Sequence, residues 1–431
     1  MKEDWVEVEL GKACYVYPGI GFPKSIQGKI KGKYPFFKVG DISKNVLAGN
    51  HKLIFCDNYI DDGDIKNIKS KILPANTVVF AKIGEALKLN RRCLTNTDSL
   101  IDNNVIGIKG KKYIDDLFLY YFTLTIKLEN YSRATTVPSV RKTDIEEIKI
   151  HFPPLPLQRT IVQKIENYFD LLDKGIAELK TAQEQLKIYR QAVLKKAFEG
   201  GLTNSKMKFL KLVDITTILG DGLHGTPKYS KKGEYYFING NNLSDGKILI
   251  KPDTKKVDEK EFEKYKKELN QYTVLVSING TIGNTAFYNN EPVILGKSAC
   301  YFNVVEGISK EYIRYNLTTS EFLNYAITNA TGSTIKNVSL KTMRNYLLPV
   351  PINKNDQRAI VREIESRLSV CDKVEENISE AVEKAEALRQ SILKKAFEGK
   401  LLSKEEIAKC KQEPDYEPAS VLLEKIRMAD T

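Results

Sequence analysis

Few residues in this chain have the types and spacing that catalysis requires. The three histidines, His51, His151 and His224, have no partner at metal-ligand spacing, which argues against a zinc or HNH-type centre. The sequence has no GxxxxGK(S/T) phosphate loop and no Asp/Asn-Pro-Pro-Tyr/Phe tetrapeptide of amino-methyltransferases. Residues 220–225 match GxGxxG, but the loop-forming residues 226–233 follow instead of the helix that a dinucleotide site needs. We therefore expect no catalytic centre, metal or cofactor in this chain.

Amide, hydroxyl and cationic side chains in loops of the second half of the chain suit recognition chemistry. Such groups contact base edges and phosphates of DNA. Turn propensity alone explains them equally well, so both interpretations stay open. The candidate DNA contacts in this half are His224, Thr226, Lys228, Asn241, Asn279, Thr281, Asn284, Lys297, Ser298, Ser333, Thr334, Lys336 and Asn337.

The first half offers a corresponding set with more cationic side chains. Arg91 and Arg92 have the chemistry to pair with guanine or phosphate, although a solvated charged loop is an equal alternative. The threonine-rich segments 133–142 and 332–341 occur at the same place in both halves, which favours shared backbone contacts. The candidates here are Lys82, Lys88, Arg91, Arg92, Arg133, Thr135, Thr136, Arg141 and Lys142.

The net charge of +12 lies entirely on two segments. Residues 1–154 hold 24 basic and 18 acidic side chains, and residues 201–352 hold 20 and 14. Solubility would account for a modest excess. Two equally basic segments separated by a neutral one favour a polyanion with two contact points.

A duplicated heptad segment must position these two basic parts. Aligning Gln158 and Arg159 on Gln357 and Arg358 also aligns the Lys-Lys-Ala-Phe-Glu-Gly endings at 195–200 and 394–399 without a gap. Apolar side chains recur every seven residues in each copy, which predicts two long helices whose seams pair in an antiparallel coiled coil. The seam residues are Ile165, Leu172, Leu179, Leu186 and Val193, then Ile364, Cys371, Ile378, Ala385 and Ile392.

Prolines before and glycines after each copy mark the helix ends. Each helix should have about 42 residues and a length of roughly 63 Å. Residues 1–150 and 205–350 both alternate short β-rich runs with turns and end in a helical pattern, near 114–130 and 310–328. The predicted fold is α+β, with two globular domains separated by two long antiparallel coiled-coil helices in a pseudo-two-fold duplication.

These patterns divide the chain into five parts. We predict one globular domain at 1–152, a first long helix at 153–202, a second globular domain at 203–350, a second long helix at 351–400 and a tail at 401–431. A short amphipathic helix at 417–427 in the tail suits core packing and partner docking equally.

The remaining composition favours a cytoplasmic protein. Its six cysteines form no CxxC pair, as expected for free thiols in a reducing compartment. No run approaches the roughly 18 apolar residues of a membrane span, and the first residues have no apolar signal-peptide core.

With these features in order, the chain resembles the specificity subunits of type I restriction-modification systems over essentially its whole length. The P-x-x-x-Q-R-x-I-V entry occurs at 154–162, and its second copy keeps Gln357, Arg358, Ile360 and Val361. Both K-x-A-F-E-G-x-L exits, the D-G-x-H-x-T-P loop at 221–227 and the E-P-A-S-x-L-L tail at 417–423 also match. The first half departs from the loop pattern, with Pro-Gly-Ile-Gly-Phe-Pro at 18–23, so individual contacts transfer better to the second half.

The resemblance implies two target recognition domains, each reading one half of a bipartite double-stranded DNA sequence, with the helices as a ruler. It also implies two methyltransferase (M) subunits that bring S-adenosylmethionine, and ATP-driven restriction (R) subunits that use Mg. The chain itself would then be non-catalytic. A stand-alone bipartite DNA-binding regulatory or architectural protein remains the first alternative, and a nuclease with an unrecognised centre remains the second.

Overall fold

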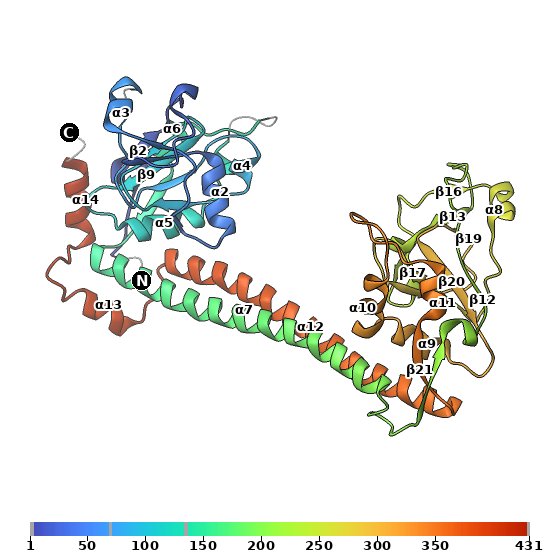
Figure 1. Ribbon diagram of the computed structural model, residues 1–431. Coiled ribbons are helices and arrows are strands. Elements are labelled where there is room, and N and C mark those ends of the chain that lie inside the picture. The colour runs from blue at the N-terminus through green and yellow to red at the C-terminus, as the bar shows by residue number, and fades with distance from the viewer. Residues whose placement is uncertain (1–3, 69–70, 133–136, 429–431) are drawn as a thin grey trace. The chain divides into compact units, whose positions relative to one another are not determined.

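The computed structural model describes residues 4–68, 71–132 and 137–428. These form two compact units, and both long helices contribute to each unit (Figure 1). Unit 1 contains Met1–Ala177 and Ala381–Thr431, and unit 2 contains Glu178–Glu380.

Unit 1 is built on three small sheets. The five-stranded sheet has the order β2(Cys14–Pro18), β9(Val105–Gly110), β6(Val78–Ala81), β7(Cys93–Thr95) and β4(Lys52–Leu53). The three-stranded sheet has the order β5(Tyr59–Ile60), β3(Tyr34–Phe37) and β8(Leu100–Ile101), and β1(Val6–Glu9) pairs with β10(Lys149–Phe152). Its shorter helices are α1(Leu10–Ala13), α2(Val39–Leu47), α3(Asp62–Ile68), α4(Glu85–Lys88), α5(Asp116–Leu124) and α6(Lys142–Glu146), with 3-10 turns η1(Lys24–Ile26) and η2(Leu128–Tyr131).

Unit 2 repeats this order of strands. Its four-stranded sheet runs β12(Thr216–Asp221), β20(Ala299–Val304), β17(Thr273–Ser277) and β18(Thr285–Phe287). A three-stranded sheet runs β16(Lys256–Val257), β13(Tyr235–Ile238) and β19(Val293–Leu295). Two antiparallel pairs are β11(Met207–Lys211) with β21(Leu347–Pro351), and the hairpin of β14(Leu243–Ser244) with β15(Lys247–Ile248). The shorter helices are α8(Glu259–Tyr265), α9(Lys310–Asn316), α10(Ser320–Thr328) and α11(Leu340–Asn345), with 3-10 turns η3(Leu212–Ile215) and η4(Gly240–Asn242).

The two units share more than strand order. In each, the middle strand of the three-stranded sheet has one antiparallel and one parallel neighbour. The single helix expected near 310–328 is instead two helices, because Thr319 caps α10 by accepting a hydrogen bond from the Phe322 N–H. Two domains with one topology and divergent loops are what duplication of an α+β domain produces.

The two long helices are α7(Leu155–Phe198) and α12(Lys354–Phe397), each of 44 residues. Unit 1 holds the start of α7 and the end of α12, while unit 2 holds the end of α7 and the start of α12, so the helices are antiparallel. Ile165, Val193, Ile364, Cys371, Ile378 and Ile392 are buried, and Leu172, Leu179, Leu186 and Ala385 are half-buried. The heptad positions thus lie on the shielded side of each helix.

Salt bridges link the long helices within each unit. In unit 1, Arg389 of α12 pairs with Asp173 of α7. In unit 2, Arg190 of α7 pairs with Asp372 (2.7 Å) and Glu375 (3.0 Å) of α12. These pairs occupy matching positions of the repeat.

A buried glutamine fastens each globular domain to the start of its own long helix. In unit 1, Gln158 Oε1 accepts from the Asp115 N–H (2.9 Å), and its Nε2 donates to the carbonyls of Tyr113 (2.9 Å) and Pro153 (2.7 Å). Asp115 is the residue that caps α5. One side chain therefore satisfies backbone groups of the domain and of the helix entry together.

Gln357 makes the same arrangement in unit 2. Its Oε1 accepts from the N–H of Ser309, the cap of α9, at 2.8 Å. Its Nε2 donates to the carbonyls of Gly307 (3.4 Å) and Pro351 (3.3 Å). The repeated Gln-Arg entry is thus a structural joint in both copies.

The repeated ending of each long helix packs into the globular domain of the unit that contains it. Phe397, at the end of α12, lies 5.0 Å from the Phe118 ring and 5.7 Å from the Phe122 ring in unit 1. Phe198, at the end of α7, lies 5.0 Å from the Tyr312 ring in unit 2. Each domain is therefore held by the start of one long helix and the end of the other.

The tail packs on unit 1 through α13(Lys404–Cys410) and α14(Ala419–Met428). Leu422 and Ile426 of α14 are buried in the core of that unit. Lys164 of α7 forms a salt bridge with Glu406 of α13 at 2.7 Å. Of the two interpretations that the sequence left open for this tail helix, the structure shows core packing.

The glutamine joint gives a first prediction. Replacing Gln158 with leucine leaves the Asp115 N–H and two carbonyls buried without partners, at a cost of about 1–3 kcal/mol. Hydrogen exchange should accelerate at the start of α5, and Gln357→Leu should do the same at the start of α9. Gln163→Leu, at an exposed position of α7, is the matched control. Equal protection in the three variants and the unmodified chain would contradict the joint.

Candidate nucleic-acid interface

Five loops meet at one edge of the four-stranded sheet of unit 2. β12 and β17 end at this edge and β18 and β20 begin there, as their pairing registers require. Backbone hydrogen bonds connect the loops: Leu223 N to Leu295 O (2.7 Å), Ile278 N to Ser298 O (2.9 Å) and Val338 N to Ile278 O (2.8 Å). The Ser298 hydroxyl adds a link by accepting from Gly240 N at 2.8 Å. Most of the candidate contacts of the second half therefore share one surface.

The candidates differ in exposure. Exposed ones are His224, Thr226, Lys228, Asn241, Thr281, Lys297, Ser333, Thr334 and Lys336; half-buried ones are Asn279, Asn284, Ser298 and Asn337. Ser298 donates to Asn239 Oδ1 (3.1 Å) and so holds neighbouring loops together. His224 Nε2 lies 2.7 Å from Oδ2 of Asp221, the last residue of β12.

Unit 1 assembles the same edge with different side chains. Lys82 N donates to Asn104 O (2.9 Å), Val140 N to Lys82 O (2.9 Å), and Ile20 N to Ile101 O (3.1 Å). These bonds match those of Ile278, Val338 and Leu223 in unit 2. Lys82 is half-buried at this edge. Arg141 and Lys142, which directly follow Val140 in the chain, are exposed.

Other candidates in unit 1 lie elsewhere. Lys88 is exposed but paired with Glu85 at 2.7 Å, and Arg91 lines a cavity beside α7. Arg133, Thr135 and Thr136 lie outside the described residues. The DNA contacts proposed for these residues stay predictions.

Arg92 is a correction to the sequence-based expectation. Its side chain is 2% exposed, and its guanidinium lies 4.8 Å from the centre of the Phe80 ring. It donates to Asn90 Oδ1 (2.9 Å) and to the carbonyls of Arg91 (3.2 Å) and Ile126 (3.4 Å), while its Nε has no partner among the described residues. Burial lowers the pKa of the Arg92 guanidinium to about 9. From this position Arg92 supports the core and exposes almost no surface with which to contact DNA.

Two residues of the loop edge were missed by sequence reasoning. Lys38 and Asn239 directly follow β3 and β13. The Lys38 N–H donates to Asp41 Oδ2 (2.7 Å), and the Asn239 N–H donates to Asn242 Oδ1 (3.0 Å). The Lys38 ammonium lies 4.9 Å from the centre of the Phe22 ring. The similarity of residues 37–42 to residues 237–243 indicates an equivalent turn in both halves. It does not show that this turn lies at the loop edge.

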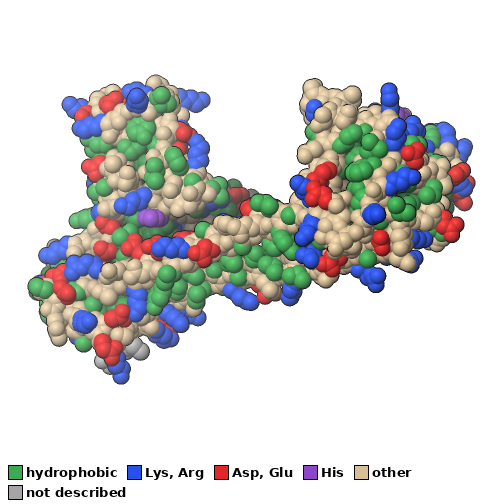
Figure 2. Space-filling model, turned by 60° about the horizontal axis from the view of Figure 1, so that its bottom comes forward, with side chains coloured by type: hydrophobic (Ala, Val, Ile, Leu, Met, Phe, Trp, Pro, Cys, Tyr) green, Lys and Arg blue, Asp and Glu red, His purple; other side chains and the backbone are tan. Residues whose placement is uncertain are grey.

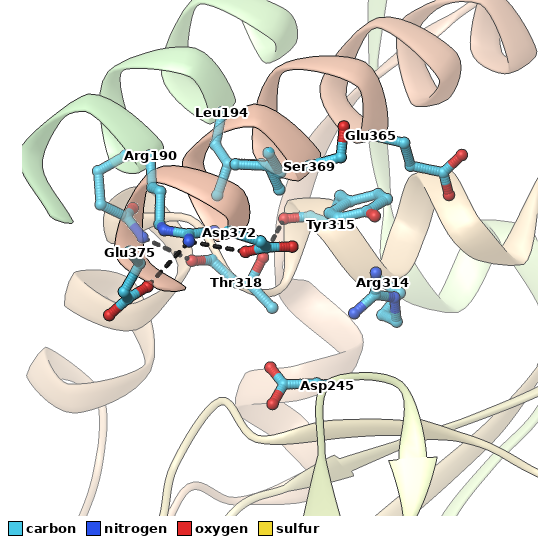
Figure 3. Close-up of a pocket in the computed structure, with 12 residues that line it drawn as sticks. Arg190, Leu194, Asp245, Arg314, Tyr315, Thr318, Glu365, Ser369, Asp372 and Glu375 are labelled. Carbon is cyan, nitrogen blue, oxygen red and sulfur yellow. Dashed lines mark hydrogen bonds and ion pairs between the residues drawn. The ribbon is translucent and has the colours of Figure 1, made fainter. Parts of the chain in front are cut away.

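Each unit also has a cavity between its globular domain and the long helices. The cavity of unit 2 measures about 800 Å³ and is lined by Arg190, Arg314, Tyr315 and Asp372 among others (Figure 3). The cavity of unit 1, about 730 Å³, has Arg389, Tyr121 and Asp173 at the corresponding positions. The duplication has therefore preserved two equivalent concave surfaces.

The described part of the chain holds neither a metal-ligand cluster nor a membrane-spanning helix. No three His, Cys, Asp or Glu side chains within it are arranged to hold a metal ion. None of its helices combines the length and apolar character needed to cross a membrane. Lysine and arginine side chains are spread over the globular domains in the view of Figure 2.

Comparison with known proteins decides the family. The profile described as "Type I restriction modification DNA specificity domain" matches twice, at residues 2–181 and 204–384. The chain belongs to this family. It is a specificity subunit, the component of a type I restriction-modification system that reads the DNA target.

Individual relatives agree with this assignment. The EcoBI specificity subunit of Escherichia coli is 22% identical over 99% of this chain and 92% of its own length, and the StySPI subunit of Salmonella potsdam is 26% identical over 74% and 73%. The crystal structure of the HsdS subunit from Thermoanaerobacter tengcongensis has a TM-score of 0.58 at 18% identity and covers 92% of this chain and 97% of that one. A structure from work on type I R-M complex assembly and conformational transition has a TM-score of 0.68 at 18% identity, covering 92% and 98%. The predicted α+β class with duplicated domains and long paired helices is confirmed.

The burial of Arg92 and the exposure of Lys297 give a second prediction. If Lys297 contacts a phosphate as predicted, Lys297→Ala should lower the slope of log affinity against log salt by about one. Arg92→Met should leave that slope unchanged, since its guanidinium lies in the core. Fluorescence anisotropy with target DNA at several salt concentrations measures both. A reduced slope for Arg92→Met at unchanged thermal stability would show that the arginine reaches DNA.

Proposed function

We propose that each globular domain reads one half of a bipartite DNA target and that this chain is non-catalytic. The observation that carries the proposal is the loop edge built twice on one sheet topology with different side chains. A shared scaffold fixes the loops in space, and their divergent side chains permit two different half-sites. Each globular segment contributes an excess of six positive charges, which suits phosphate contact at both.

We further propose that the long helices set the gap between half-sites. Residues 155–200 hold 8 basic and 6 acidic side chains and residues 353–399 hold 9 and 10, so the helices lack the positive charge of a DNA-binding surface. Their length is fixed by paired heptads, and their ends are anchored by Gln158, Gln357, Phe198 and Phe397. A rigid element anchored at both ends suits a spacer.

The same helices offer equivalent surfaces to two copies of one partner. Leu171 and Val370 occupy matching repeat positions and are 65% and 62% exposed; Tyr189 and Leu388 also match and are 45% and 48% exposed. Figure 2 shows hydrophobic side chains among the charged ones on the long helices. Apolar side chains kept exposed in both copies favour a covering partner. We assign this role to two methyltransferase subunits, which would bring S-adenosylmethionine.

Restriction subunits, with ATP and Mg, complete the proposed assembly in the cytoplasm. A stand-alone bipartite DNA-binding regulator is the alternative, and it would bind its site tightly without a partner. The purified chain should neither cleave nor methylate DNA, whereas with its methyltransferase it should methylate a split site. Failure to form that complex would contradict the proposed function, and cleavage by the chain alone would favour a nuclease.

The spacer role gives a third prediction. One heptad added between Ala177 and Glu178, with a second between Glu380 and Ala381, keeps the helices paired and lengthens them by about 10 Å. The gap between half-sites should grow by about three base pairs, at about 3.4 Å each, with both half-sites unchanged. Sequencing of methylated sites reads the gap.

An insertion in α7 alone is the control for the spacer. It lengthens α7 between Asp173 and Arg190 but leaves α12 unchanged, so the salt bridges of Arg190 and Arg389 cannot both form. The stability of the complex should therefore fall. An unchanged gap in the doubly extended chain would contradict the spacer role.

A fourth prediction concerns partner stoichiometry. A glutamate at Leu171 or at Val370 puts a charge into one proposed docking surface, so each single variant should retain one methyltransferase subunit instead of two. The double variant should retain none. Native mass spectrometry counts the subunits, and circular dichroism checks that the helices persist. Two bound subunits in the double variant would place the docking surface elsewhere.

A further inference from the structure

The loop edge of unit 2 carries a pair of asparagines where unit 1 carries other side chains. Asn279 forms an isolated antiparallel bridge with Asn337, and Ile83 forms the equivalent bridge with Ser139 in unit 1. The equivalence follows from the flanking bonds, because Val338 N donates to Ile278 O (2.8 Å) as Val140 N donates to Lys82 O (2.9 Å). One backbone arrangement thus presents two amides in one domain and an apolar side chain with a hydroxyl in the other.

The backbone around Asn337 is firmly held. Its N–H donates to Thr331 O (2.8 Å), and Thr331 N donates to Asn337 O (2.9 Å), which closes a hairpin. Gly332 within the hairpin has φ +94°, and a Cβ there would lie 2.4 Å from Ile335 O. The turn therefore requires glycine. On the other side, the Ser277 hydroxyl donates to Asn279 O at 3.2 Å.

The two amides are also fixed to each other. Asn279 Nδ2 donates to Asn337 Oδ1 at 3.1 Å. No described residue forms a hydrogen bond with Asn279 Oδ1 or Asn337 Nδ2, and both side chains are half-buried at the loop edge. The pair therefore offers one acceptor and one donor, already oriented, beside the exposed cations Lys297 and Lys336. Groups ordered in advance lose little entropy when they bind.

The geometry points to the Asn279–Asn337 pair as a base-reading element that recognises an adenine in the half-site of the second domain. In the major groove adenine presents the N6 amino donor and the N7 acceptor side by side, the complement of a free amide acceptor and donor. Lys297 and Lys336 hold adjacent phosphates, which position the domain without reading sequence. The assignment rests on the proposed function, in which each domain reads one half-site.

Domain one supplies the substitution that tests this assignment. Changing Asn279→Ile and Asn337→Ser together installs the side chains that the equivalent bridge of unit 1 already accommodates, so the loop edge should fold as before. The chain carrying both changes is assembled with its methyltransferase subunits and given a duplex library with both half-sites randomised. Methylated products are then sequenced. Preference for adenine should fall about 10- to 100-fold at one position of one half-site.

Two controls separate base reading from general binding. Lys336→Ala should weaken binding to all sequences alike and lower the salt slope by about one, with base preference unchanged. The reciprocal change in domain one, Ile83→Asn with Ser139→Asn, should alter only the other half-site. Thermal unfolding of every variant verifies folding.

Each outcome bears on a different claim. Unchanged base preference in the folded double variant overturns the assignment of the asparagine pair while leaving the proposed function intact. Relaxation at a G·C position overturns the adenine assignment. An unmodified complex that selects no bipartite site contradicts the proposed function itself.

Discussion

The architecture depends on two buried glutamine amides, Gln158 and Gln357, at the starts of the long helices. Each amide bonds to the backbone just before a capped helix of its domain and to the backbone just before its own long helix. A buried amide left without these partners would be costly, so domain and helix keep one relative arrangement. The phenylalanine at the end of the other helix adds a second attachment to the same domain. A domain held at two points on paired helices cannot pivot freely on either one.

Because the attachments are the same in both units, the loop edges are free to differ. The backbone bonds that join the loops recur at Lys82 and Ile278 and at Val140 and Val338, whereas the side chains between them do not. The residues that hold the scaffold are separate from the side chains of the loop edge. Substitutions at the loop edge can therefore change the DNA sequence that one domain recognises without disturbing its glutamine joint.

Periodicity and repeats in the sequence predicted the duplication, the two antiparallel helices and the shielded heptad positions, because these depend on local patterns. Three features depend on tertiary context and could not be predicted. Arg92 looked like a surface cation beside Arg91, but the loop turns it onto Phe80. The repeated glutamine was visible as a motif, yet its partners in the globular domain lie over 40 residues away in the chain. The burial of α14 depends on an apolar surface of unit 1 that no local pattern shows.

The contacts that read DNA are the hardest part to infer from one sequence, since polar loop residues are as common in ordinary turns as at interfaces. Internal duplication removes part of this difficulty. Where two units have the same backbone hydrogen bonds, a residue that both need for folding should keep its chemistry, as Gln158 and Gln357 do. A residue whose chemistry changes while its backbone bonds persist, as between Asn279 and Ile83, is released from that folding requirement. Such positions on a rigid edge are where target choice can vary without loss of the fold.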